Sequence, residues 1–173
     1  MVGVNTVIAD NPSLTTRMEV PGLHPIRIVI DSSLRIPLES AVVTDGQAAT
    51  IVVTTAAADP AQKTALEAAG VTVVVSGAGP RVDLQAAMVT LGEMEISSIL
   101  LEGGGTLNGS MLESGLVDRV VLFFAPKIVG GGSHAAGTFE FPGVELMKDA
   151  VTLEGLEVEV LGDNVCISGT PVR

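Results

Sequence analysis

Short apolar runs rich in Val and Ile alternate along this chain with segments whose residues favour helices. The runs are "PIRIVID" at 25–31, "TIVVTT" at 50–55, "VTVVV" at 71–75 and "SSILLEGGG" at 97–105. Continuous apolar runs with many β-branched residues are typical of strands that are buried on both faces. Because helix-like segments separate the runs, their order predicts a mainly parallel sheet with helices on both faces.

Two of the intervening segments carry start and stop signals for helices. Asp59 and Pro60 precede "AQKTALEAA" and Gly70 follows it, which matches an N-cap, a first-turn proline and a C-terminal glycine. Asp83 stands near the start of an amphipathic segment at 83–94. Both segments are therefore expected to be helices that connect neighbouring strands.

The last third of the chain has a different pattern. A helix is expected at 106–115, a strand at 116–125 and a glycine-rich loop, which contains His134, at 125–137. The segment 151–172 alternates apolar and polar residues on either side of "GDN", which is typical of two antiparallel strands joined by a tight turn. The sequence therefore predicts a C-terminal antiparallel hairpin.

The first residues, "MVGVN", are typical of the end of a strand, and Asp10, Asn11 and Pro12 indicate a turn. A chain of 173 residues is long enough for one domain and too short for two ordinary ones. We therefore predict a single α/β domain over 1–173, with a mixed, mainly parallel sheet and a C-terminal antiparallel hairpin.

Charge and composition exclude several classes of function. The formal net charge of −11 argues against a general nucleic-acid surface or an anionic-membrane surface, because both need dense Lys and Arg. Cys166 is the only cysteine, and His24 and His134 are the only histidines, so no metal site is expected. No apolar run reaches the roughly 18 residues of a membrane span, and no signal peptide is recognisable, which favours the cytoplasm.

The segment "EGGGTLNGS" at 102–110 places a carboxylate and three glycines where a strand is expected to turn into a helix. The N-terminus of a helix exposes unpaired N–H groups that favour anions, and glycines let a phosphate approach the backbone closely. The third glycine of the Rossmann dinucleotide motif is absent, and no Lys-Ser/Thr pair of a P-loop follows. The segment is either an anion-binding turn or a tight turn with a helix cap.

Three other positions are candidates for ligand contacts. Asp10 and Arg17 bracket a proline-containing loop, and Arg17 could hold a phosphate through two N–H groups or could be a solvated surface residue. Asp31 and Ser32 end a predicted strand, where they could meet ligand hydroxyls or cap the next turn. No Ser, His and Asp set indicates a serine hydrolase.

Taken together, these segments resemble one family. "TVIADNPSLTTR" at 6–17, "PIRIVIDSSLRIP", "LLEGGGTLNGS" at 100–110 and "GDNVCISG" occur in that order. They are similar to the C-terminal reductase domain of the bifunctional riboflavin-biosynthesis deaminase/reductase. The resemblance covers almost the whole chain and implies a dihydrofolate-reductase-like fold. It also implies that a further strand and helix precede the segment that begins at residue 1.

The resemblance implies NADPH-dependent reduction of 5-amino-6-(5-phosphoribosylamino)uracil to 5-amino-6-(5-phosphoribitylamino)uracil by a cytoplasmic homodimer. It places the cofactor contacts on Thr6, Asp10, Ser32, Gly104, Gly105, Thr106, Leu107, Asn108, Gly109 and Ser110. It places the substrate contacts on Leu14, Arg17, Asp31 and Glu102. Asp10, Glu102 or water would donate the proton that accompanies the hydride.

Two alternatives remain open at this point. The chain could be an oxidoreductase of the same fold with another small substrate, or a non-catalytic nucleotide-binding module. The sequence also does not decide between NADPH and NADH.

Overall fold

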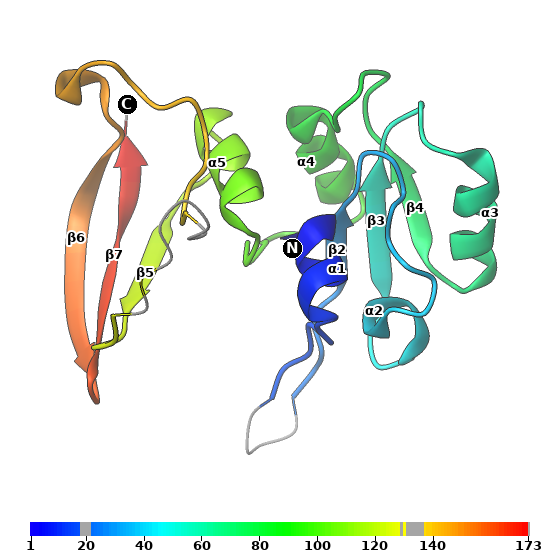
Figure 1. Cartoon of the computed structure of the whole chain (residues 1–173), viewed down its shortest axis with the longest axis horizontal. Helices are drawn as coiled ribbons and strands as arrows, with labels where there is room; N and C mark the ends of the chain where they lie inside the picture. The colour runs from blue at the N-terminus through cyan, green and yellow to red at the C-terminus, as the bar shows by residue number, and fades with distance from the viewer. Residues whose placement is uncertain (18–21, 129, 131–136, 173) are drawn as a thin grey trace.

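The computed structural model describes residues 1–17, 22–128, 130 and 137–172 of the chain (Figure 1). Most of the glycine-rich loop expected at 125–137, including His134, lies outside these residues. Among the described residues, no helix has both the length and the apolar character needed to cross a membrane.

A four-stranded parallel sheet forms the first half of the molecule. Its strands lie in the order β1 (Val2–Gly3), β2 (Arg27–Ile30), β3 (Thr50–Thr54) and β4 (Thr72–Val75) (Figure 1). All three strand pairs are parallel, with Ile28 opposite Ile51 in the β2–β3 pair. The strands expected at 25–31, 50–55 and 71–75 are thus confirmed.

Helices cover both faces of this sheet, as the apolar runs predicted. On one face, Val29 and Val52 pack with residues of α1 (Val4–Asp10), α2 (Ala41–Thr44) and α3 (Pro60–Ala68). On the other face, the neighbouring strand residues Ile28, Ile51 and Val53 pack with Ala87 and Leu91 of α4 (Leu84–Glu93). Successive strand residues point to opposite faces, so two separate cores form from one apolar run.

The helix starts follow the predicted capping residues. Asp59 Oδ1 accepts a hydrogen bond of 2.8 Å from the Ala61 N–H, and Pro60 is the first residue of α3. Asp83 Oδ1 accepts one of 3.0 Å from the Ala86 N–H at the start of α4. Each carboxylate satisfies an N–H group that has no acceptor inside its helix.

A separate three-stranded antiparallel sheet forms the other end of the molecule. Its strands lie in the order β5 (Val120–Phe124), β7 (Asn164–Val172) and β6 (Thr152–Leu161), with a short 3-10 helix, η2 (Met147–Asp149), before β6. The predicted hairpin is confirmed. However, β5 joins it in a sheet of its own and does not extend the parallel sheet, and α5 (Gly105–Glu113) lies between the two sheets (Figure 1).

Two local features differ from the sequence-based expectation. Residues 4–10, where no helix was expected, form α1, because Val4 and Val7 lie one turn apart and both reach the core. Residues 97–101, expected to be a strand, are not part of either sheet. This segment is tied to the chain start by the Met1 ammonium, which donates to the Leu100 carbonyl at 2.6 Å, and by the Glu102 N–H, which donates to the Met1 carbonyl at 2.9 Å.

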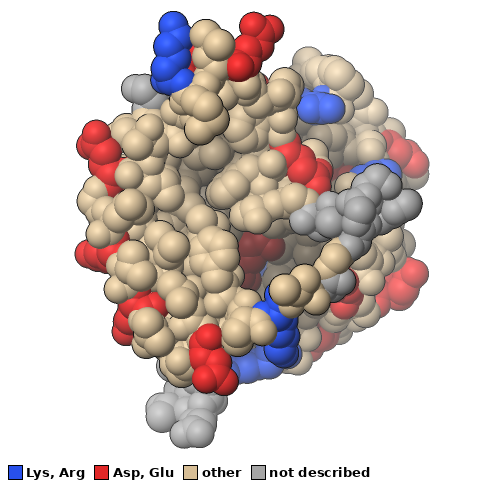
Figure 2. Space-filling view, turned by 60° about the vertical axis from the view of Figure 1, so that its left-hand side comes forward, with Lys and Arg blue, Asp and Glu red and all other residues tan. Residues whose placement is uncertain are grey.

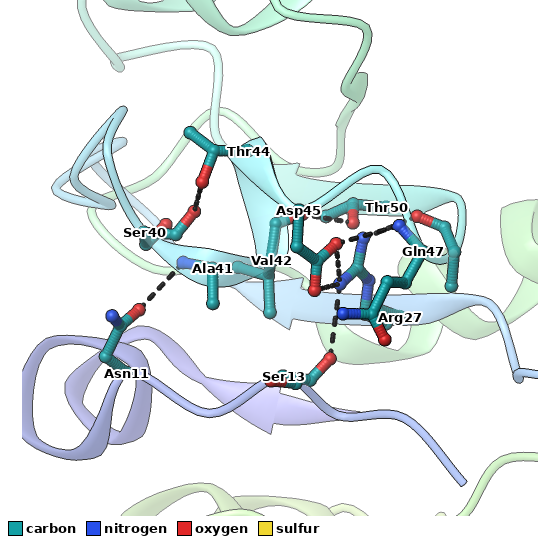
Figure 3. A network of polar contacts seen from close by, with 11 residues as sticks. Asn11, Ser13, Arg27, Ser40, Ala41, Val42, Thr44, Asp45, Gln47 and Thr50 are labelled. Atoms are coloured by element: carbon teal, nitrogen blue, oxygen red, sulfur yellow. Dashed lines mark hydrogen bonds and ion pairs between the residues drawn. The ribbon is translucent and has the colours of Figure 1, made fainter.

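A buried ion pair connects three segments at the start of β2 (Figure 3). Arg27 is only 3% exposed, and its Nη1 lies 2.8 Å from both carboxylate oxygens of Asp45. The same guanidinium donates to the carbonyl of Ser13 at 3.2 Å and to the carbonyl of Ala48. Arg27 therefore fixes the turn after α2 and the segment after α1 to the sheet.

The network also changes the acidity of Asp45. Partial burial raises the pKa of this carboxyl group, but the Gln47 N–H and the Arg27 guanidinium together lower the pKa by more, so that it lies below its ordinary value. A carboxyl whose folded-state pKa is depressed stabilises the fold above its unfolded-state pKa. That stabilisation is lost as the pH falls through the folded-state value.

We predict that Asp45→Asn lowers the free energy of unfolding by about 3 kcal/mol at neutral pH, because it leaves the buried Arg27 charge without its counter-ion. Denaturant titration measures this loss. The difference between the wild type and Asp45→Asn should be largest at neutral pH and should shrink as the pH is lowered below the ordinary pKa of an aspartate.

Glu67→Gln is the matched control, because Glu67 pairs with Lys63 at 3.8 Å and both side chains are at least 40% exposed. Its effect should stay below about 0.5 kcal/mol. Equal losses in the free energy of unfolding for Glu67→Gln and Asp45→Asn would show that the buried Arg27–Asp45 pair stabilises the fold no more than an exposed pair does.

Candidate functional site

A cavity of 360 Å³ lies at the carboxyl ends of β1 and β2, where ligands of parallel sheets usually bind. Its walls come from the start of α1, the segment after β2, the segment before α4 and the start of α5. The lining residues that carry the argument below are Thr6, Ser32, Arg35, Arg81, Gly104 and Thr106.

Gly104 opens the α5 wall of this cavity. It is the N-cap of α5 in an extended conformation, with φ −65° and ψ 167°, and it offers no side chain to cap the helix. The Leu107 N–H donates to the Gly104 carbonyl at 3.1 Å, and the N–H groups before it have no acceptor within the helix. A Cβ at Gly104 would meet only Thr6 Oγ1, at 3.8 Å, so the backbone here is open on its cavity side. This arrangement suits a phosphate at the helix N-terminus.

The next two glycines of the motif have a different task. A Cβ at Gly105 would overlap the Gly137 carbonyl oxygen, and a Cβ at Gly109 would overlap the Glu140 carbonyl oxygen. Neither glycine lines the cavity. The segment 137–140 of the chain itself approaches the backbone at Gly105 and Gly109, where the family resemblance implied contacts with the cofactor.

Three hydrogen bonds hold the segment 137–140 against α5, and a fourth, between Gly137 and Glu140, closes the segment on itself. Glu140 Oε2 accepts from Thr106 Oγ1 at 2.8 Å, and Glu140 Oε1 accepts from the Gly137 N–H at 3.2 Å. The Glu140 N–H donates to the Gly105 carbonyl at 2.8 Å, and Asn108 Nδ2 donates to the Thr138 carbonyl at 3.1 Å. Asn108 therefore points to this segment and does not line the cavity. No motif in the sequence marks Glu140, so its role at this helix could not be predicted from the sequence.

Of the ten expected cofactor residues, six line the cavity. They are Thr6, Ser32, Gly104, Thr106, Leu107 and Ser110. Asp10, Gly105, Asn108 and Gly109 do not line it. The structure thus gathers most of the expected cofactor set at one place, and it adds two residues that the sequence analysis did not single out, Arg35 and Arg81.

Asp31 is a buried structural residue in this fold. Its side chain is 0% exposed, and its Oδ2 accepts the Ile36 N–H at 2.8 Å. Its Oδ1 has no hydrogen-bond partner among the described residues. Asp31 lines neither of these two cavities and lies under the turn that carries Ser32 and Arg35, so its expected contact with the substrate stays a prediction.

The expected substrate residues do not all lie in one cavity. Leu14 and Glu102 line a second cavity of 290 Å³ beside the beginning of β2, together with Met1. Leu14 has a φ of 51°, in the left-handed region that is unfavourable for a bulky residue. Burial lowers the pKa of the Met1 ammonium, and the Glu102 carboxylate partly opposes that shift. Arg17 and Asp10 are exposed and line neither cavity.

Comparisons with known sequences agree with the resemblance. The sequence matches the RibD C-terminal domain family over residues 1–167. It is 42% identical over 168 residues to riboflavin biosynthesis protein RibD of Actinobacillus pleuropneumoniae, covering 96% of this chain and 44% of that protein. It is 40% identical over 172 residues to the 2,5-diamino-6-ribosylamino-4(3H)-pyrimidinone 5′-phosphate reductase of Methanothermobacter thermautotrophicus, covering 98% of this chain and 78% of that protein. The chain thus spans less than half of this RibD relative.

Solved structures share the fold. The chain superimposes on RibD of Acinetobacter baumannii with a TM-score of 0.78 at 23% identity, over 99% of this chain and 46% of that one. It superimposes on the riboflavin biosynthesis reductase of Saccharomyces cerevisiae with a TM-score of 0.74 at 20% identity, over 99% and 74% of the two chains. The α/β fold expected from the resemblance is confirmed.

We predict that Gly105→Ala and Gly109→Ala each lower the free energy of unfolding by about 1–3 kcal/mol, because a methyl group at either position overlaps the backbone of 137–140. Thermal unfolding measures the loss. Gly104→Ala is the control, since its methyl group has room, and its melting temperature should stay close to that of the wild type. A loss at Gly104 as large as at Gly105 would contradict this assignment.

Proposed function

The chain belongs to the RibD C-terminal domain family, and on that basis we propose that it is a pyrimidine reductase of riboflavin biosynthesis. The proposed reaction is the NADPH-dependent reduction of 5-amino-6-(5-phosphoribosylamino)uracil to 5-amino-6-(5-phosphoribitylamino)uracil. The observation that carries the proposal is the 360 Å³ cavity at the strand ends, which gathers six of the residues that the family resemblance assigns to the cofactor.

The residues present fit a nicotinamide dinucleotide. Gly104 leaves the first N–H groups of α5 open to a pyrophosphate, and a Cβ at this position would extend into the space that the phosphate needs. The Ser110 and Thr106 hydroxyls stand on the same helix wall. A bound nicotinamide would supply the hydride, and the protein's part is to hold and orient the two reactants.

Few groups of this chain are candidates to donate the proton that must accompany the hydride. Reduction at C1 of the opened ribose, present as an aldehyde or imine, leaves an oxygen or nitrogen that takes up a proton. Glu102 is the better placed carboxyl group, because it lines the cavity that also contains Leu14, whereas Asp10, at the end of α1, lines neither cavity. Water is the third candidate for this donor.

Arg17 is proposed to bind the substrate phosphate. Its side chain is exposed and has no ion-pair or hydrogen-bond partner among the described residues, so it is available to a ligand. Its guanidinium can bind a phosphate through two parallel N–H groups. The ion pair between Arg27 and Asp45 supports this role, because Arg27 holds the Ser13 carbonyl four residues before Arg17.

One observation favours an alternative pyrimidine substrate. The Methanothermobacter relative, which this chain covers over 78% of its length, is named for reduction of 2,5-diamino-6-ribosylamino-4(3H)-pyrimidinone 5′-phosphate. The two compounds share the phosphoribosylamino arm and differ at one ring position, where an amino group replaces an oxygen. Both compounds could therefore make the same phosphate contact. A comparison of their turnover decides which one is the substrate.

The test is oxidation of NADPH by the full chain, followed by absorbance, with each of the two pyrimidines. We expect turnover with at least one of them. We also expect Arg17→Ala to raise KM for the pyrimidine by roughly 10- to 100-fold, the loss typical of a charged hydrogen bond, without changing KM for NADPH.

Arg119→Ala is the matched control, because Arg119 pairs with Glu157 on the antiparallel sheet and lies outside both cavities. It should leave both KM values unchanged. NADPH binding without oxidation in the presence of either pyrimidine would favour an oxidoreductase with another small substrate. Absence of NADPH binding would favour a non-catalytic module.

We further propose that the protein is a homodimer. One face of the antiparallel sheet exposes Phe124, Val158 and Val160, at 53%, 65% and 71% exposure. The register places Phe124 of β5 and Val160 of β6 on either side of Val165 of the central strand β7, with Val158 two residues along β6 from Val160. Figure 2, which brings this side of the molecule forward, shows a broad, largely uncharged surface with Asp, Glu, Lys and Arg side chains around it. Apolar surface of this kind is typical of an interface.

Sedimentation measurement should therefore give twice the mass of one chain. Val158→Asp should shift the protein toward the monomer, because it places a charge in the apolar surface of each partner. Glu159→Gln, at the neighbouring position on the opposite face, is the control and should leave the mass unchanged. A wild-type monomer at all concentrations would disprove the dimer.

A further inference from the structure

The segment that follows α1 has an unusual backbone at its start. Asn11 has a φ of 43° and Leu14 a φ of 51°, so both residues are left-handed. Asn tolerates this conformation, whereas a bulky side chain such as that of Leu disfavours it. A strained residue persists only where the surrounding contacts fix its backbone. Other parts of the chain must therefore hold the segment 11–14 in place.

The Asn11 side chain makes the first of these contacts (Figure 3). The backbone of Asn11 ends α1, and its N–H donates to the Val7 carbonyl at 3.0 Å. Its side chain has a separate partner, because Asn11 Oδ1 accepts the Ala41 N–H at 2.8 Å. A glycine would end the helix equally well. The Asn11 side chain is therefore not needed to end α1, and its bond to Ala41 joins two separate segments.

The Ala41 N–H depends on this distant acceptor. Ala41 is the first residue of α2, and the N–H groups of a first turn have no acceptor inside their helix. Ser40 is the N-cap residue, but it makes no capping bond, and its hydroxyl donates to the Pro37 carbonyl at 2.7 Å. Asn11 thus supplies the cap that Ser40 does not.

The second contact comes from Arg27, whose Nη1 donates to the Ser13 carbonyl at 3.2 Å. Arg27 is itself fixed by Asp45, the residue directly after α2. Helix α2 is anchored in turn, because Val42 is 1% exposed and its carbonyl accepts from Thr50 Oγ1 of β3 at 2.6 Å. The segment 11–14 is therefore attached at two points to a part of the fold that the core holds.

The residues expected to meet the substrate lie immediately beyond these two attachments. Leu14 directly follows Ser13, packs against the core beneath α1 and α2, and lines the 290 Å³ cavity. Arg17 comes three residues later, in a loop where Thr16 Oγ1 donates to the Leu23 carbonyl at 3.4 Å. The path of the chain toward Leu14 and Arg17 therefore starts from the bonds at Asn11 and Ser13.

We propose that Asn11 is a positioning residue of the pyrimidine site, which acts with Arg27 to hold Leu14 and Arg17 in the conformation that binds the substrate. This inference rests on the proposed function, which assigns the substrate phosphate to Arg17. Without the bond to Ala41, the segment populates other conformations. The apparent affinity for the pyrimidine then falls by the fraction of molecules that leave the binding conformation.

The test compares Asn11→Gly with the wild type in NADPH oxidation. Glycine keeps the left-handed backbone and removes only the side-chain acceptor. We expect KM for the pyrimidine to rise roughly 3- to 10-fold, as for a population shift equal to one neutral hydrogen bond. KM for NADPH should not change, because Val4 and Val7 fix α1 in the core. Asn11→Asp, which keeps an acceptor oxygen, should recover most of the wild-type KM.

Asp59→Ala is the matched control. It removes the same kind of bond, from Asp59 Oδ1 to the Ala61 N–H at 2.8 Å, at the start of α3 and outside both cavities. It should lower the melting temperature about as much as Asn11→Gly does and leave both KM values unchanged. A rise in the pyrimidine KM as large in Asp59→Ala as in Asn11→Gly would overturn the proposal, since general loss of stability would then explain both.

A double variant tests whether Asn11 acts through Arg17. If Asn11 positions Arg17, Asn11→Gly should raise the pyrimidine KM less in the Arg17→Ala background than in the wild type, because the positioned group is absent. Effects of the two changes that multiply in full would contradict this role.

Cleavage by trypsin after Arg17, followed by mass spectrometry, needs no substrate. Asn11→Gly should speed this cleavage by roughly 3- to 10-fold, because local opening exposes the backbone to the protease, and Asp59→Ala should not. Wild-type turnover with an unchanged pyrimidine KM in Asn11→Gly overturns the inference and supports the proposed function. Absence of wild-type turnover overturns the proposed function. In that case faster cleavage of Asn11→Gly still supports the attachment of the segment, and unchanged cleavage overturns it.

Discussion

Burial of β2 and β3 on both faces is the constraint on which the rest of the structure depends. The strand residues alternate between two cores, one beneath α1, α2 and α3 and the other beneath α4. Because the strands are parallel, their carboxyl ends lie at one edge, and the segments that leave them must turn there. The main cavity is formed by those turning segments and by the start of α5, so its lining follows from the packing of the sheet.

The strands of the parallel sheet and the two capped helices could be predicted from the sequence, because their signals are local. β-branched runs, Asp59 before Pro60 and Asp83 before α4 each act within a few residues. The failures involve distant partners. Helix α1 has many β-branched residues and forms because Val4 and Val7 reach a core built mostly from later segments. The separation of the two sheets likewise has no signature in a short window.

In the candidate site, too, local sequence patterns predicted some features and missed those that depend on distant residues. The glycine run indicated that something approaches the backbone, and the structure shows two different neighbours: the cavity at Gly104 and the segment 137–140 at Gly105. No pattern within the run distinguishes these cases. Arg35 and Arg81 are single charged residues in separate loops that line one cavity, and the bond from the Val82 N–H to Ser32 joins those two loops. The scarcity of basic residues in an acidic chain was the one signal that could have drawn attention to them.

The two sheets also differ in how well water is excluded from them, and this affects the cooperativity of unfolding. Every residue of β3 is buried, whereas nearly every residue of β6 is exposed. Amide protons of β3 exchange with solvent only when the parallel half opens, while β6 loses its protection in smaller and more frequent openings. Within a single chain, we therefore expect the antiparallel half to open before the parallel half. A single unfolding free energy describes this protein only where pairing between two chains, or another partner, covers the exposed sheet and joins the two transitions into one.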